Sequence, residues 1–72
     1  MNNKVPTKRE IEVLDLIAEE MTMHEISRQL FISYQTVLTH RKNLFSKLNA
    51  KNTAGLMRKA YENRLLILSN HH

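Results

Sequence analysis

The chain has 72 residues, enough for one small domain, and it contains no cysteine. Disulfides and thiolate metal sites are therefore excluded. No apolar run approaches the roughly 20 residues that span a bilayer, and no secretory signal pattern is present. Gly and Pro occur only once each, and the frequent Leu, Ile, Lys, Glu and Met favour helix. We expect an all-α protein of the cytoplasm.

The net charge of +4 is unevenly distributed along the chain. No acid occurs from Ile26 through Tyr61. One-sided charge over half a domain indicates a polyanionic partner, although an ordinary solvated basic face is the alternative. The cations of this acid-free window are Arg28, Arg41, Lys42, Lys47, Lys51, Arg58 and Lys59.

The first predicted helix covers residues 8–19. Thr7 and Glu10 have the spacing of a capping box, in which each side chain accepts from the other residue's backbone N–H. The acids of the first turns, Glu10, Glu12 and Asp15, suit the positive end of the helix dipole, and we interpret them as solvated surface. Apolar residues recur at helical spacing at Ile11, Leu14, Ile17, Ala18 and Met21.

Two further helices are predicted, over residues 23–30 and 34–48. Thr22 and Glu25 repeat the capping-box spacing before the first of them. A short turn then leads to Ser33, a strong N-cap residue for the next helix. The inward side of that helix is expected to carry Val37, Leu44 and Leu48, with Arg41 between them.

A fourth helix is predicted over residues 53–62. Asn49 is expected to end the preceding helix in a left-handed conformation, which Asn tolerates better than most residues, and Asn52 is the expected N-cap. We divide the chain into a disordered lead-in or linker remnant at residues 1–5, a domain at 6–68 and a tail at 69–72. The terminal His71–His72 pair is interpreted as a tag remnant without function.

The order of these helices is that of a helix-turn-helix, in which the third predicted helix enters the major groove of DNA. Its outer side mixes hydrogen-bonding, apolar and basic groups and has no acid. These outward residues are Tyr34, Gln35, Leu38, Thr39 and Lys42.

The sequence resembles the LuxR-type (GerE- or NarL-like) DNA-binding domains of bacterial transcription regulators. Residues 7–14, TKREIEVL, resemble the opening "T-x-R-E-x-E-V-L" of that family. Residues 25–40 match its central pattern E-I-S-x-x-L-F-I-S-x-x-T-V-x-x-H, and Lys47–Leu48 match the pair that closes its third helix. The resemblance implies four helices, major-groove binding and transcription regulation, in many members as the output domain of a response regulator.

Four residues depart from the family pattern, and the first, Ser27, replaces the usual small Ala at little cost. Glu20 stands where the family usually has a Gly that ends the first helix, so a left-handed backbone there would be strained. Thr53 replaces a common Arg of the fourth helix. Leu38 replaces a Lys that reaches bases in many members, and it could contact a thymine methyl group instead.

We assign roles from position and resemblance together. The predicted base contacts are Gln35, Leu38, Thr39 and Lys42, of which Lys42 can donate to guanine O6 or N7. The predicted DNA backbone contacts are Arg28, Tyr34, Thr36, His40, Lys47 and Lys51. For Thr36 the alternative is a hydroxyl bonded back to its own helix, for Tyr34 an exposed aromatic beside the turn, and for His40 a structural role.

The fourth helix offers a dimer surface, because members of the family often pair through it. Its predicted residues are Leu56, Ala60, Tyr61 and Arg64, and the alternative is that they complete the core.

Double-stranded DNA is the predicted partner, with a contact to RNA polymerase left open and no membrane partner. A helical protein-interaction module that keeps this fold without reading DNA is the competing function, and a sigma-factor-like promoter module is a second one. An enzyme is not expected, since no Gly-rich phosphate loop or sheltered Ser/His/Asp arrangement occurs. The histidines lack ligand spacing, so we predict no metal site and no cofactor.

Overall fold

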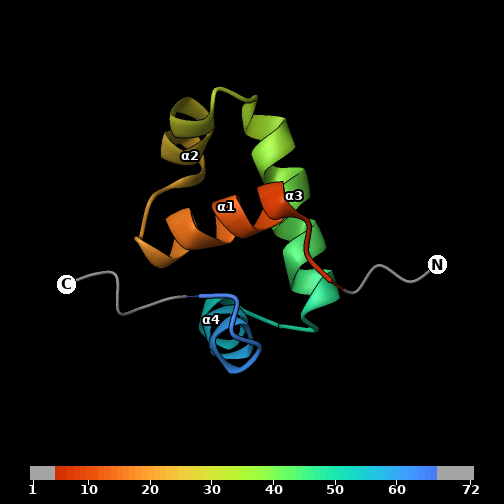
Figure 1. The fold of residues 1–72 in the computed structure, drawn as a ribbon. Helices are drawn as coiled ribbons and strands as arrows, with labels where there is room; N and C mark the ends of the chain where they lie inside the picture. Colours follow the sequence, from red (N-terminus) through yellow and green to blue (C-terminus); the bar gives the residue numbers. More distant parts are fainter. Residues whose placement is uncertain (1–4, 67–72) are drawn as a thin grey trace.

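The structure, a computed structural model, describes residues 5–66, and this range forms four helices and no strand (Figure 1). They are α1 (Lys8–Ala18), α2 (Met23–Leu30), α3 (Tyr34–Lys47) and α4 (Thr53–Glu62). The predicted all-α, four-helix fold is confirmed. α1 and α3 end one residue before their predicted ends, because Glu19 and Leu48 are cap residues with non-helical backbone angles.

Parts of the predicted segments lie outside the described residues: residues 1–4 of the lead-in, residues 67–68 of the domain and the whole tail at 69–72. At the edges of the described range, Val5 is exposed while Pro6 is buried. After α4, Leu65 is half-buried and Leu66 is buried. The chain therefore returns to the core after its last helix. No helix within residues 5–66 has the length and apolar character needed to cross a membrane.

The first two helices begin with the predicted capping boxes. The Thr7 hydroxyl accepts from the Glu10 N–H at 3.1 Å, and Glu10 Oε1 accepts from the Thr7 N–H at 2.9 Å. Thr22 and Glu25 repeat this exchange at 3.1 and 2.8 Å. Each box satisfies two backbone donors that the helix itself leaves without acceptors. The starts of α1 and α2 are therefore set by local sequence.

Each helix is followed by a residue with a left-handed backbone, and Asn49 is one of them, as predicted. The turn after α1 is closed by two backbone hydrogen bonds, from the Glu20 N–H to Ile17 O at 2.9 Å and from the Met21 N–H to Leu16 O at 3.1 Å. None of the four residues is Gly, although Gly adopts this conformation at least cost. Their φ angles are 66° at Glu20, 58° at Phe31, 55° at Asn49 and 60° at Arg64.

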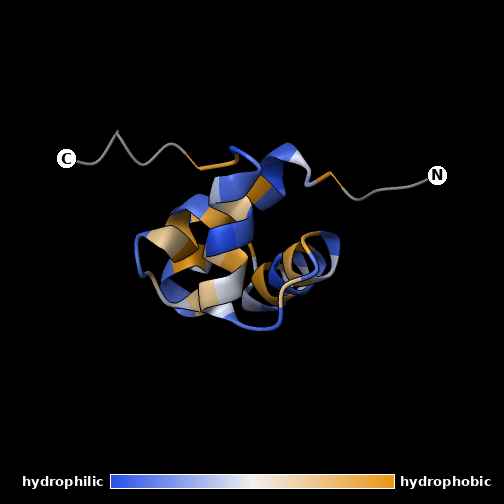
Figure 2. Ribbon diagram, turned by 90° about the horizontal axis from the view of Figure 1, so that it is seen from below, coloured by the Kyte–Doolittle hydropathy of each residue, from blue (hydrophilic) through white to orange (hydrophobic). Residues whose placement is uncertain are grey.

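One apolar core joins all four helices. α3 packs against both α1 and α2. α4 lies on the opposite side of α1 from α2, beyond the C-terminal end of α3, and closes the core there (Figure 1). Apolar and polar residues alternate along the helices as each turns one side inward (Figure 2). Val13 was not in the predicted stripe of α1, yet it is fully buried, because α1 contacts two helices and buries a wider face. The core consists of Val13, Leu14, Ile26, Val37, Leu44, Leu48, Leu56, Ala60 and Leu66.

A buried ion pair joins the start of α1 to the end of α3. The Glu10 residue is only 3% exposed, and its Oε1 accepts from Lys47 Nζ at 2.8 Å. The interpretation of the α1 acids as solvated surface is therefore wrong for Glu10, because α3 passes beside the first turn of α1. It holds for Glu12, which is exposed and pairs with Arg9 at 2.9 Å.

The ion pair determines how Glu10 titrates. Burial disfavours the charged carboxylate, but hydrogen bonds from Lys47 and the Thr7 backbone, with the charge of Lys47, keep the pKa of Glu10 below its usual value. A carboxyl whose pKa is lowered by folding stabilises the fold at pH values above its unfolded pKa, about 4.3. That stabilisation is lost as the pH falls through the pKa of the folded state.

Replacing Glu20 with Gly is expected to raise the free energy of unfolding by about 1 kcal/mol, because Gly adopts the left-handed backbone without the Cβ strain. Urea unfolding followed by circular dichroism measures the change. Glu19→Gly is the matched control, since Glu19 has a negative φ and is also exposed. A neutral result at Glu20 would show that the turn carries no strain.

Lys47→Met is expected to lower the free energy of unfolding by about 3 kcal/mol at pH 7, because it leaves a buried carboxylate without its partner. The difference from the wild type should shrink as the pH falls through the pKa of Glu10, because a protonated carboxyl no longer requires the charge of Lys47. Urea unfolding across a pH series measures both effects. Arg9→Met, which breaks an exposed pair, should cost about 0.5 kcal/mol or less. A pH-independent loss at Lys47 would contradict the ion-pair account.

Candidate nucleic-acid interface

α2, the turn that follows it and α3 form the predicted helix-turn-helix. The turn carries a left-handed residue at Phe31 and ends at Ser33, whose hydroxyl accepts from the Thr36 N–H at 3.0 Å and so caps α3. The inner side of α3 is fixed by Val37 and Leu44, both fully buried. Because these two side chains must face the core, the rotation of α3 about its own axis is determined.

The opposite side of α3 is free of contacts with the core and forms a continuous exposed stripe. We call it the outer stripe, and its members recur every three or four residues, as one face of a helix requires. Three predicted base contacts lie on it, while Ser46 was not predicted although it continues the same spacing. No member is acidic. The outer stripe consists of Gln35, Thr39, Lys42 and Ser46, all exposed.

The fourth predicted base contact, Leu38, lies beside the outer stripe rather than on it. Leu38 is half-buried, and it lines a hollow of about 450 Å³ together with Met21, Met23 and Arg41. It is partly covered because the start of α2 lies close to this flank of α3, and its base contact stays a prediction. Its exposed part remains at the edge of the interface.

Aromatic and cationic side chains pair on the flank of α3 that carries Leu38. Tyr34 stacks on His24 of α2, with ring centroids 4.1 Å apart and planes 16° from parallel. Arg41 lies over the ring of Phe45 at 4.5 Å, within the range of a cation–π interaction. Tyr34 is therefore an aromatic held against α2, still 41% exposed, and the His24 contact was not foreseen from the sequence.

Two threonine hydroxyls of α3 already have partners within the domain. The Thr36 hydroxyl shares a hydrogen bond of 2.8 Å with the Ser33 hydroxyl. The Thr39 hydroxyl donates to the Gln35 carbonyl at 3.1 Å, a bond common for Thr within helices. Both residues are exposed, so their oxygens can still accept and their methyl groups remain accessible.

Two predicted backbone contacts lie on the core side of α3. His40 precedes Leu44 by four residues and Lys47 follows it by three, which places both near the buried face. His40 is half-buried, and its Nδ1 is enclosed without a hydrogen-bond partner in the described structure. The ammonium of Lys47 is held by Glu10, with 16% of its side chain exposed. A phosphate contact by either residue stays a prediction.

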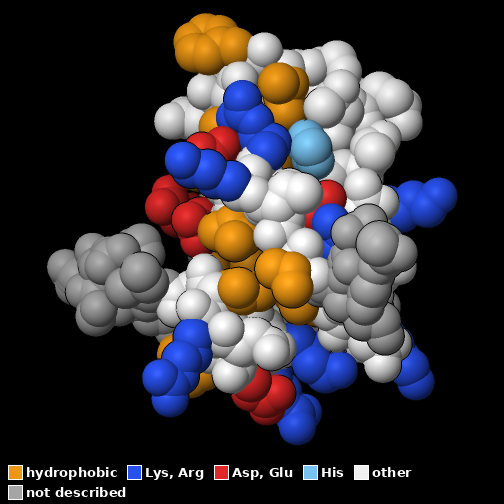
Figure 3. All heavy atoms as spheres, turned by 45° about the vertical axis from the view of Figure 1, so that its right-hand side comes forward, with side chains coloured by type: hydrophobic (Ala, Val, Ile, Leu, Met, Phe, Trp, Pro, Cys, Tyr) orange, Lys and Arg blue, Asp and Glu red, His pale blue; other side chains and the backbone are white. Residues whose placement is uncertain are grey.

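The remaining predicted backbone contacts, Arg28 and Lys51, are exposed. Arg28 lies near the end of α2, and Lys51 lies in the connection between α3 and α4. On the face shown in Figure 3, the largest group of acidic side chains lies on the left, others lie near the centre and at the bottom, and basic side chains are spread around the face.

The predicted dimer surface on α4 is only partly exposed. Leu56 and Ala60 are both 0% exposed and belong to the core, so they are not available to a partner. The alternative interpretation, that they complete the core, is correct for these two residues. Tyr61 is 59% exposed and Arg64 is exposed, and only these two remain of the predicted surface.

The sequence matches a model of a known protein family. The family is described as "Bacterial regulatory proteins, luxR family", and the match covers residues 4–60. This range includes α1, α2, α3 and most of α4.

Three known proteins with a similar sequence or structure are regulators. The transcriptional regulatory protein LiaR of Bacillus subtilis is 45% identical over 60 residues, which cover 83% of this chain and 28% of LiaR. The oxygen regulatory protein NreC of Staphylococcus epidermidis is 38% identical over 63 residues, which cover 88% of this chain and 29% of NreC. The response regulator ChrA of a heme-sensing two-component system has a TM-score of 0.83 and 30% identity, over 92% of this chain and 33% of ChrA. The chain thus spans no more than a third of any of the three.

Proposed function

The chain belongs to the luxR family of bacterial regulatory proteins, and from this premise we propose that α3 reads bases in the major groove of double-stranded DNA. The domain is a helix-turn-helix of a DNA-binding transcription regulator.

The outer stripe is the observation that carries this proposal. It is exposed along the whole of α3 and contains no acid. A helix that enters the major groove needs one side free of intramolecular contacts and free of negative charge, because phosphates line both edges of the groove. Because the inner side of α3 is buried, the outer stripe is the side of the helix that can enter the groove.

Within the outer stripe, each residue type suits a different base edge. Lys42 can donate to guanine O6 or N7, and Gln35 can bond adenine at N6 and N7. The Thr39 hydroxyl is bonded to the helix backbone, so its methyl group is the part better suited to a thymine methyl. Leu38 offers a second apolar contact from the flank of the stripe.

Phosphate contacts position such a domain without reading sequence. Arg28 and Lys51 carry this role in the proposal, since both are exposed cations outside the outer stripe. Tyr34 and Thr36, at the start of α3, could donate their hydroxyls to the nearer strand. The other predicted contacts are His40 and Lys47. A DNA phosphate would have to approach them from the side of α3 that faces α1.

The complete regulator is proposed from its relatives. ChrA is a response regulator, and we place this domain at the output end of a regulator of that type in the bacterial cytoplasm. Tyr61 and Arg64 are the residues of α4 with which two copies could meet on inverted half-sites. A contact with RNA polymerase is part of the same proposal.

The division between base and phosphate contacts can be tested on selected DNA. Duplexes bound by the wild type are enriched from a random pool, and fluorescence anisotropy then measures affinity for one selected and one scrambled duplex. Lys42→Ala is expected to cost about 1–3 kcal/mol on the selected duplex and less on the scrambled one. The ratio of specific to non-specific binding therefore falls.

Arg28→Ala is the matched control for a lost positive charge. It should weaken both duplexes by the same factor and reduce the slope of log affinity against log salt by about 0.9. Equal effects of the two variants on the specificity ratio would contradict the division of roles. If the wild type binds no duplex in a salt-sensitive manner at micromolar protein, the alternative of a protein-interaction module gains support instead.

A further inference from the structure

A hollow on the flank of α3 brings together residues from all four helices. It is the hollow of about 450 Å³ that Leu38 lines, and we call it the flank hollow. The end of α1, the turn into α2, one side of α3 and the first residue of α4 all contribute to it. Its volume lies within the range of small-molecule sites, about 300–1,000 Å³. Its lining includes Glu20, Met21, Met23, Leu38, Arg41 and Thr53.

Three of the four departures from the family pattern meet in the flank hollow. Thr53 stands in place of a common Arg, Leu38 in place of a Lys, and Glu20 in place of a Gly. The first two exchanges replace long cationic side chains by shorter, uncharged ones, so the hollow is more open and more apolar than the family pattern would make it. Departures that are far apart in the sequence but surround one space favour a role for that space.

The wall of the flank hollow is apolar and partly open to water. Ile17, Met21, Met23 and Leu38 are each half-buried, and covering such apolar surface with a ligand is favourable. Two of the four are methionines, whose sulfur atoms make favourable contacts with aromatic rings. The wall therefore suits an aromatic ring.

Arg41 supplies a positive charge at this wall. Its guanidinium lies over the Phe45 ring at 4.5 Å, and it forms no salt bridge within residues 5–66. Stacking uses the face of the guanidinium, so its in-plane N–H groups can donate to a carboxylate in the bidentate geometry. The acid among the described lining residues, Glu20, is exposed, and solvent screens its charge more than that of the half-buried Arg41.

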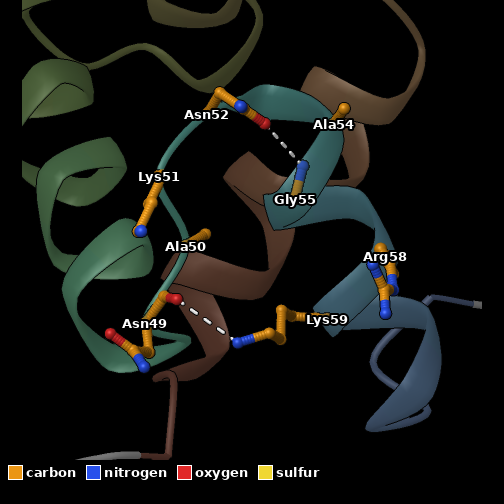
Figure 4. Close-up of a pocket in the computed structure, with 8 residues that line it drawn as sticks. All are labelled: Asn49, Ala50, Lys51, Asn52, Ala54, Gly55, Arg58 and Lys59. Carbon is orange, nitrogen blue, oxygen red and sulfur yellow. Dashed lines mark hydrogen bonds between the residues drawn. The ribbon is translucent and has the colours of Figure 1, made fainter.

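The hollow at the connection between α3 and α4 has a different character (Figure 4). Its charged lining residues are the cations Lys51, Arg58 and Lys59, but its apolar side chains are only the methyl groups of Ala50 and Ala54. This hollow can attract an anion but has no apolar wall for a ring. It therefore provides control positions for a ligand that needs both.

We propose that the flank hollow binds a small aromatic carboxylate, with its ring against Met21 and Met23 and its carboxylate on Arg41. The bound ligand lies beside Leu38 at the edge of the outer stripe, and it brings a negative charge next to the surface that meets DNA phosphates. The ligand therefore weakens DNA binding, and DNA weakens ligand binding by the same factor. This second part of the inference rests on the proposed reading of DNA by α3.

Cinnamate, a planar ring with one carboxylate, is the probe for the free domain. Titration followed by the amide resonances of the protein should give saturable shifts at residues 20–23, 38 and 41, with a dissociation constant on the order of 1 mM for so small a ligand. Cinnamamide, which lacks the charge, and acetate, which lacks the ring, should bind about tenfold more weakly or less. Shifts that do not saturate, or that centre on residues 49–59, would overturn the proposal.

Two matched pairs of variants test the lining. Arg41→Met should remove the preference for cinnamate over cinnamamide, whereas Arg58→Met removes the same charge from the hollow in Figure 4 and should leave that preference intact. Thr53→Met should weaken cinnamate binding by filling the flank hollow, whereas Ala54→Met places the same side chain one residue further on, in the other hollow. Circular dichroism confirms that each variant is folded. Equal effects within either pair would count against the site.

The effect on DNA is measured separately, by anisotropy of a labelled duplex at constant ionic strength. Cinnamate at about ten times its own dissociation constant should raise the dissociation constant of the duplex about tenfold if the two exclude each other, and acetate should not. If cinnamate binds the free domain but leaves DNA binding unchanged, the coupling is wrong. If the wild type shows no salt-sensitive DNA binding at all, the proposed function of α3 fails, and the titration of the free domain still decides whether the ligand site exists.

Discussion

The ion pair between Glu10 and Lys47 joins the first turn of α1 to the last turn of α3, the helix that carries the interface. The same carboxylate that closes the capping box of α1 also holds the last turn of α3. Buried ion pairs contribute little net stability compared with apolar packing, so its main effect is geometric. With Val37 and Leu44 fixed in the core, the pair sets both the rotation of α3 and its position along α1. The outer stripe faces solvent as a consequence.

The side chains around α3 are already ordered in the unbound domain. Tyr34 is stacked on His24, Arg41 lies over Phe45, and the Thr39 hydroxyl is bonded within the helix. Ordering interface side chains on binding costs about 0.5–1.5 kcal/mol for each mobile one. This cost is therefore concentrated in the long exposed side chains of the outer stripe, chiefly Gln35 and Lys42. An interface whose surrounding side chains are already ordered, with only a few long side chains left to order on binding, suits a surface that must distinguish base edges.

The helices could be predicted because their signals are local. Capping boxes, the N-cap at Ser33 and the left-handed Asn49 each depend on residues within one turn, and all are present in the structure. The Glu10–Lys47 pair spans 37 positions, and no local pattern marks it. The same limit explains why the sequence could not decide the partial burial of Leu38 or the full burial of Leu56 and Ala60. A helical period gives the direction in which a side chain leaves its helix. Whether that side chain is buried depends on the helices packed beside it.

The acid-free window gains a clearer meaning from the structure. It extends from Ile26 through Tyr61, and so includes α2 after its first turn, α3, the α3–α4 connection and nearly all of α4. The acid-free stretch therefore runs past the end of α3 to Glu62, the acid that pairs with Arg58. The distribution of charge thus favours a DNA footprint that continues past the end of α3.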